Sequence, residues 1–130
     1  MIENLGGITS DLVGLALDNA VFRQKVIANN IANADTPGFI PERVKFEEMF
    51  SRFLFDASGK LDESLAKHDI NRIRDSIDDG LSLYEEKGAA IELDMETARL
   101  AENVLRYKAL LEASTKRGSI LKTAILEGRN

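Results

Sequence analysis

The sequence contains neither cysteine nor tryptophan, and aromatic residues make up only 6% of its 130 residues. Without cysteine the chain has no disulfide, no thiol nucleophile and no thiolate metal site, and its composition fits a reducing or an oxidising compartment equally well. A core with so few aromatic rings must be built from Leu, Ile, Val and Ala, which suits packed helices better than a β-sandwich. The chain is about one domain long, and we expect it to be mainly α-helical.

Long apolar runs and clusters of basic charge are also lacking. The longest apolar run, residues 12–17, is interrupted by Gly14 and is far too short to cross a bilayer. The first residues include Glu3 and Asp11 and no basic stretch, so they do not resemble a cleavable signal peptide. A formal charge of -5 without a basic cluster disfavours a nucleic-acid partner. We therefore expect no direct membrane insertion and no binding to nucleic acid.

Patterns typical of catalytic and metal sites are sparse. The only histidine, His68, is followed by Asp69, a pair that can act as a general base, but no nucleophile or oxyanion-hole motif accompanies it. A calcium loop starting at Asp69 would place Ile73 and Arg74 at its fifth and sixth positions, which require an oxygen ligand and a glycine. The sequence has no phosphate loop, dinucleotide fingerprint or His-Glu zinc motif. We expect no catalytic residues, no metal and no cofactor.

A helix is predicted over residues 10–34, with Ser10 or Asp11 as its N-cap. Its apolar residues recur in alternating steps of four and three, the spacing of a coiled-coil seam more than of the wide face of a globular helix. Such a helix is about 37 Å long. This N-terminal seam consists of Val13, Leu17, Ala20, Ile27, Ile31 and Ala34, with Gln24 as its one polar member.

A second, longer helix is predicted from about residue 94 to residue 127. It is on the order of 50 Å long, too long for a domain of this size to bury alone. The two seams can pair with each other in a helical hairpin or small bundle, or with copies from neighbouring molecules, and periodicity alone leaves both arrangements open. The C-terminal seam consists of Leu93, Thr97, Leu100, Val104, Tyr107, Leu111, Ser114, Gly118, Leu121 and Ile125.

The segment between the two helices has a different texture. Apolar residues at helical spacing predict a short amphipathic helix over residues 46–55, ended by a turn at residues 56–60. Residues 61–87 are charged and weakly patterned, with Leu81, Leu83 and Tyr84 as the only local apolar cluster, and we expect loop with some helix there. The predicted organisation is an N-terminal seam helix at 1–34, a turn and middle segment at 35–90, and a C-terminal seam helix at 91–130. The fold class is mainly α, with the long terminal helices pairing as a coiled-coil-like hairpin or bundle.

The most informative stretch is KVIANNIANADTPGFIP, residues 25–41. Asparagine is a mediocre helix former, yet Asn29, Asn30 and Asn33 all occupy the last turns of a periodic helix. Residues 36–39, Thr-Pro-Gly-Phe, fit a tight turn in which proline supplies a fixed dihedral and Gly38 a positive one. One asparagine suffices for a C-cap, so three predict further hydrogen bonds, to the carbonyls of the turn or to the backbone of a neighbouring chain.

The same stretch resembles a known family. IANNIANADTPGF is similar to the signature segment of the bacterial flagellar axial proteins, the rod and hook group, in which a helix ends in Ala-Asn-x-x-Thr-x-Gly followed by an aromatic residue. The Asp-Thr-Pro-Gly version at residues 35–38 is similar to the B type of basal-body proximal-rod protein in particular. Further matches cover GAAIELDMETARLAENVLRY at residues 88–107 and GSILKTAI at residues 118–125. Ala89 and Ala90 depart from the Asn and Thr usual in the family, and residues 51–87 match little.

The resemblance implies a structural subunit of the proximal rod of the bacterial flagellar basal body, with no catalytic role and no cofactor. It implies export by the flagellar type III apparatus without a cleaved signal, and a place in the rod within the periplasmic space. The implied partners are further copies of the chain and other rod subunits, together with the membrane-ring and export-gate end of the basal body. In such an assembly the terminal helices form the shaft that transmits torque.

Two sets of candidate site residues follow. We expect the assembly interface to consist of the seam residues Leu17, Ile27, Ile31, Leu100, Val104, Tyr107, Leu111, Leu121 and Ile125. The family motif, which we expect to set how the first helix turns into the middle segment, consists of Asn29, Asn30, Asn33, Asp35, Thr36, Pro37, Gly38 and Phe39. The main alternative is a soluble helical adaptor or chaperone of a type III secretion system that uses the same seams to hold a partner's helix. The weakest interpretation is an enzyme that acts through His68 and Asp69.

Overall fold

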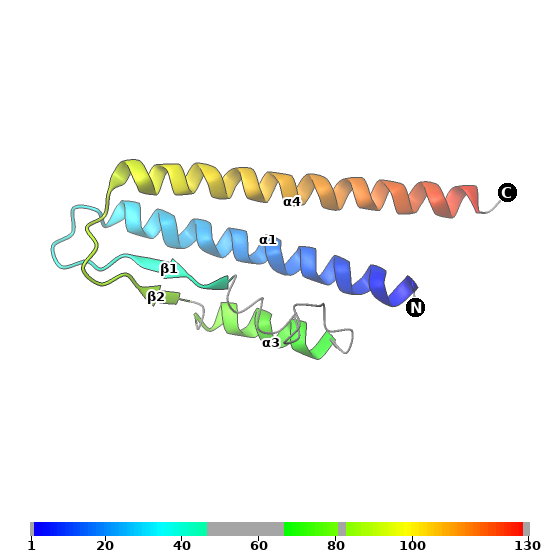
Figure 1. The fold of residues 1–130 in the computed structure, drawn as a ribbon, viewed down its shortest axis with the longest axis horizontal. Helices are drawn as coiled ribbons and strands as arrows, with labels where there is room; N and C mark the ends of the chain where they lie inside the picture. Colours follow the sequence, from blue (N-terminus) through cyan, green and yellow to red (C-terminus); the bar gives the residue numbers. More distant parts are fainter. Residues whose placement is uncertain (1, 47–66, 81–82, 129–130) are drawn as a thin grey trace, which may run out of the picture.

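The computed structural model describes residues 2–46, 67–80 and 83–128, and the side chains of residues 10–46, 70–80 and 83–128. Two long helices lie side by side, and a pair of short strands and a third helix lie along one flank of the two helices (Figure 1). In chain order the elements are α1 (Ile2–Ala32), β1 (Glu42–Val44), α3 (Lys67–Asp78), β2 (Leu83–Glu85) and α4 (Leu93–Glu127). The fold is mainly helical, with the terminal helices packed against each other, as the sequence predicts.

The two long helices run antiparallel, so both chain ends lie at the same end of the molecule (Figure 1). α4 begins at Leu93 and ends at Glu127, within one residue of the predicted range. α1 begins at Ile2, ahead of the N-cap expected at Ser10 or Asp11. With 35 residues, α4 is about 52 Å long. Among the described residues, no helix combines the length and the apolarity needed to cross a membrane.

The hydrophobic core lies between α1, α3 and the end of β1. The isoleucines of α3 stand at positions i, i+3 and i+7, so they share one face of that helix. Burying side chains of this size stabilises the fold by about 1.5–3 kcal/mol each. The expectation that Leu81, Leu83 and Tyr84 were the only apolar cluster of residues 61–87 is wrong. The apolar face of α3 was not recognised in the sequence because charged residues stand between its isoleucines. The buried members of the core are Leu15, Phe46, Ile70, Ile73 and Ile77.

α1 is buried on two sides, where the sequence predicted a single seam. Ala20 and Ile27 of the predicted seam are buried on the side that meets α4. Leu12 and Phe22 pack instead against the core formed with α3, together with the buried Leu15. These residues recur at helical spacing and form a second stripe. α1 is therefore the central element of the molecule, held by α4 on one flank and by α3 and β1 on the other.

A two-stranded antiparallel sheet, which the sequence did not predict, joins β1 to β2. We call this pair of strands the hairpin, although α3 lies between them in the chain. Arg43 pairs with Tyr84, and the N–H of Glu86 donates to the carbonyl of Pro41 at 2.8 Å to extend the ladder. Strands of three residues are too short for a period of two to be visible in the sequence. The hairpin returns the chain toward the start of α4, and it thereby places Arg43 beside the first turns of that helix.

Two expectations fall partly outside the described residues. The helix expected over residues 46–55 and the turn expected at residues 56–60 lie outside the described residues, apart from Phe46, which is buried in the core. The backbone of His68 and Asp69 belongs to α3, but their side chains are outside the described set.

Candidate functional site

The motif residues after α1 build the predicted tight turn. The N–H of Phe39 donates to the carbonyl of Thr36 at 3.2 Å, and Gly38 has a φ of 75°. The Thr36 hydroxyl donates to Oδ1 of Asn33 at 3.2 Å, and the side-chain amide of Asn33 donates to the carbonyl of Asn29 at 2.8 Å. Asn29 and Asn33 therefore close the C-terminal end of α1 against its own turn. The remaining motif residues of the turn, Asp35 and Pro37, are exposed.

Asn30 has a different task, because it points toward the hairpin and is completely buried. Its side-chain N–H donates to the carbonyl of Glu42 at 2.9 Å, and its Oδ1 accepts from the N–H of Glu42 at 3.1 Å. One amide thus satisfies both main-chain groups of a strand residue, as the next strand of a sheet would do. Asn30 thus fixes β1 to α1, whereas Asn29 and Asn33 hold the end of α1 to its turn.

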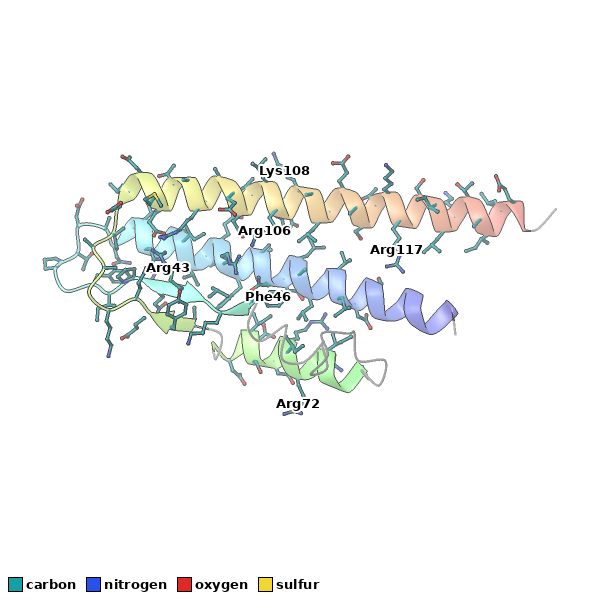
Figure 2. The ribbon with its side chains drawn as sticks, in the orientation of Figure 1. Arg43, Phe46, Arg72, Arg106, Lys108 and Arg117 are labelled. Atoms are coloured by element: carbon teal, nitrogen blue, oxygen red, sulfur yellow. The ribbon has the colours of Figure 1, made fainter. Side chains whose placement is uncertain are left out.

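A buried ion cluster ties the hairpin to α4. Nη2 of Arg43 donates to Oε1 of Glu96, whose side chain is only 1% exposed. Nε of Arg43 donates to Glu86 at 2.9 Å, and Nη1 of Arg99 donates to Oε1 of Glu96 at 2.7 Å. Arg43 belongs to β1, Glu86 follows β2 and Glu96 lies in the first turn of α4. Figure 2 labels Arg43 near the hairpin end of the long helices.

The arginines keep the buried carboxylate charged. Burial by itself raises the pKa of Glu96, but the hydrogen bonds and charges of Arg43 and Arg99 outweigh it, so the pKa lies below its ordinary value. Burial likewise lowers the pKa of Arg43, and its contacts with Glu96 and Glu86 reverse the change and raise that pKa. The cluster is therefore an ion pair at neutral pH. Its carboxylates are occupied by arginines, which fits a structural role better than acid–base chemistry.

A third polar contact joins α4 to α1. Asn103 is buried, and its side-chain amide donates to the main-chain carbonyl of Ala20 at 2.8 Å. We call the residues that make these three sets of contacts the polar junction. It holds β1 to α1, β1 to α4, and α4 to α1, so that each element is fixed to the other two. The polar junction consists of Asn30, Arg43, Glu86, Glu96, Arg99 and Asn103.

A groove of about 280 Å³ opens beside the polar junction, between α1, the hairpin and α4. Arginines and glutamates both line it, among them Arg23, Arg106, Glu42 and Glu102. With both charge signs present, the groove has no clear preference for an anion or a cation. In the described part of the chain, no three His, Cys, Asp or Glu side chains are grouped so as to hold a metal ion.

The predicted interface residues divide into three groups. Ile27 is buried within the chain, whereas Leu111, Leu121 and Ile125 are 46%, 52% and 66% exposed. The ribbons of α1 and α4 diverge toward the chain ends (Figure 1), and Leu111, Leu121 and Ile125 belong to the C-terminal half of α4. The first three turns of α4 therefore pack on α1, and its C-terminal part presents an uncovered apolar surface among the described residues. The half-buried members are Leu17, Ile31, Leu100, Val104 and Tyr107.

The ion cluster and the exact face that α4 turns to α1 were not predicted from the sequence. The buried positions of α4 are Glu96 and Asn103, which lie seven residues apart and share one face with Leu100 and Tyr107. A polar residue inside an apolar stripe reads as a break in the pattern, so the predicted seam was drawn through Thr97 and Val104, one position away. The signal available was the regular spacing of the two polar residues themselves.

Comparisons with known proteins give one consistent result. A family model described as "Flagella basal body rod protein" matches residues 16–39, the stretch with the asparagines and the turn. The chain is 32% identical over 122 residues to the flagellar basal body rod protein FlgB of Bacillus subtilis (strain 168), covering 88% of this chain and 90% of that protein. It is 30% identical over 115 residues to FlgB of Borrelia hermsii, covering 80% of this chain and 85% of that one. No solved structure is significantly similar.

Proposed function

The chain belongs to the family of flagellar basal body rod proteins of the FlgB type, and we propose from its geometry how it serves as a structural subunit of the rod. In this proposal the terminal helices are the assembly elements, and the subunit belongs to the proximal part of the rod. The observation that carries the proposal is the C-terminal part of α4, whose apolar side chains Leu111, Leu121 and Ile125 are exposed in the lone chain.

The exposure of these apolar side chains supports the assignment of a contact surface to α4. Single exposed leucines are common on soluble proteins, but exposed apolar residues that continue a regular seam for several turns favour a helical partner. An additional half-buried set at Leu100, Val104 and Tyr107 continues the same stripe toward the hairpin. Neighbouring subunits that cover the stripe through heterologous contacts would build a helical shaft rather than a closed dimer.

The polar junction supports a mechanical role for the subunit. A rod that carries torque must resist relative sliding of its helices, and isolated helices bend and fray. In this chain, directional contacts at Asn30, Glu96 and Asn103 join three elements within the first turns of α4. Buried hydrogen bonds and ion pairs hold one relative position of two helices, whereas apolar contacts tolerate sliding. The subunit would therefore transmit force from α4 to α1 without a change of register.

We also propose a location and partners for the subunit, which the family membership supports. We place the subunit in the basal body with other rod subunits and copies of itself, in the periplasmic space. The membrane-ring and export-gate proteins are its proposed neighbours below, and the flagellar type III apparatus is its proposed export route, used without a cleaved signal. The relatives are named as rod proteins, so a soluble adaptor or chaperone is not favoured. An enzyme acting through His68 and Asp69 gains no support from a family of structural rod proteins.

Photo-crosslinking in cells tests the proposed contact surface. A photoreactive amino acid at Leu121 or Ile125 should yield covalent adducts with rod subunits in swimming cells. The same group at Asp75, exposed on α3, is the matched control and should yield fewer adducts of this kind. If neither α4 position gave an adduct while the cells swam normally, the assignment of α4 as an assembly element would be wrong.

A further inference from the structure

The hairpin end of the molecule is acidic. We call residues 35–41 and 85–95 the tip; they lie at the end of the molecule opposite to both chain ends (Figure 1). Lys87 carries the only exposed amine of the tip. The helix dipole favours carboxylates beside the start of α4, but it does not account for those on the loop after α1 and at the end of β2. The exposed carboxylates of the tip are those of Asp35, Glu85, Glu92 and Asp94.

The C-terminal turns of α4, residues 113–126, carry charge of the other sign. Every charged residue between Glu112 and Glu127 is basic. The helix dipole favours basic residues in the last turn of a helix, but the last turn of α4 has none, so the helix itself does not explain where they stand. The basic residues are Lys116, Arg117 and Lys122, and both lysines are exposed.

Both surfaces also expose apolar side chains. At the tip, Ile40 is 39% exposed, and Leu93 and Met95 are each 49% exposed. Two surfaces that combine apolar side chains with charges of opposite sign are complementary, because the apolar contacts supply affinity and the charges select the partner. The exposed apolar residues of the C-terminal turns are Ile120, Leu121, Ile125 and Leu126.

The C-terminal turns cannot reach the tip of their own chain. α4 begins at the tip, and its 35 residues extend about 52 Å away from it. A second copy of the chain, however, supplies an acidic and apolar tip. We propose that the tip is the docking surface for the C-terminal turns of α4 of a second copy, so that copies join head to tail.

This contact is heterologous. Each copy that joins keeps one free tip or one free helix end, so the assembly grows as a filament and does not close. The inference rests on the proposed function, because it names the surface that receives the assembly element α4.

Sedimentation velocity of the purified chain tests the contact with two variants, each altered on one surface. The tip variant carries Glu92→Gln and Met95→Ser; the Glu92 side chain makes no capping hydrogen bond, so its replacement leaves the start of α4 intact. The end variant carries Lys122→Gln and Ile125→Ser, both at exposed positions. Circular dichroism checks that each variant keeps its helices.

The matched control carries Lys25→Gln and Val21→Ser, the same kind of exchange at exposed positions of α1 away from both surfaces. The native chain and the control should form species larger than a dimer. Each surface variant alone should associate at least about tenfold more weakly, because an apolar contact and an ion pair are lost. An equimolar mixture of the two variants should stop at a dimer, since each pair holds one intact tip and one intact helix end.

Three results would overturn the inference. A native chain that stays monomeric at every soluble concentration would exclude a second copy as the occupant of the tip. Native-level assembly of both surface variants, or an equal loss in the control, would show that the contact lies elsewhere. A native chain that stops at a dimer would indicate a closed antiparallel pair instead of head-to-tail growth. Absence of the protein from basal bodies would refute the proposed function, but it would leave the association of the purified chain as measured.

Discussion

Replacing Glu96 by glutamine removes the charge that pairs with Arg43 and Arg99 at the start of α4 while it keeps the size of the side chain. The carboxylate is 1% exposed, and the Arg43 side chain is 14% exposed, so neither group can recover its hydration when the pair is broken. Removing one partner of a buried ion pair destabilises a protein by about 3–5 kcal/mol. Glu86 still pairs with Arg43 and Arg99 is partly exposed, so we expect about 3 kcal/mol.

A loss of this size is easy to measure. For a chain of this length it lowers the melting temperature by roughly 10 °C, because each kcal/mol shifts the transition by a few degrees. Urea titration followed by circular dichroism gives the free energy of unfolding for the native chain and for Glu96→Gln at neutral pH. A double change, Arg43→Met with Glu96→Met, should lose less than the sum of the two single changes by about 1–3 kcal/mol.

The pH dependence tests the cause. The pKa of Glu96 in the folded chain lies below its unfolded value of about 4.3, so the contribution of the ion pair is complete above that pH. It is lost as the pH falls through the folded pKa. The stability difference between the native chain and Glu96→Gln should therefore shrink in acid. A difference below about 1 kcal/mol at neutral pH, or one that stays constant in acid, would refute the role assigned to the cluster.

Three further changes test the turn, the hairpin and the assembly surface. Leu111→Asp should change the free energy of unfolding by less than about 0.5 kcal/mol, because Leu111 is exposed in the lone chain, but it should abolish swimming. Ala109→Asp, on the opposite side of α4, is the control. Normal swimming of Leu111→Asp would contradict the proposed contact. Gly38→Val should cost about 1–2 kcal/mol in urea titration because of the positive φ, and Gly38→Asn should cost less; equal losses would show that the dihedral is not the cause. Asn30→Leu should speed hydrogen exchange at the Glu42 amide, measured by NMR, and native-level protection there would mean that the contact is not made in solution.

Local patterns in the sequence predicted the long helices and the turn. The apolar spacing of four and three is repeated over many turns in both helices, and Pro37 with Gly38 specifies a turn by its backbone chemistry alone. Such signals need no knowledge of distant parts of the chain. The resemblance to the flagellar axial proteins rests on the local stretch at residues 25–41 and on the segments at residues 88–107 and 118–125, and the family model matches residues 16–39.

Contacts between distant residues were beyond this kind of reasoning. Arg43 and Glu96 are 53 positions apart, and Asn103 bonds to a residue 83 positions away. Nothing in their immediate neighbourhood marks them as partners. The three-residue strands were too short to show a period, and the isoleucines of α3 were diluted by charges. The polar junction therefore became visible only once the fold had brought its residues together.

The most direct test of the central claim is mass spectrometry of detergent-purified hook and basal-body complexes from the source bacterium, scored for peptides of this chain beside the other axial subunits. A structural rod subunit should be present at a few copies per structure. Its absence from preparations in which other rod proteins are plainly detected would contradict the account.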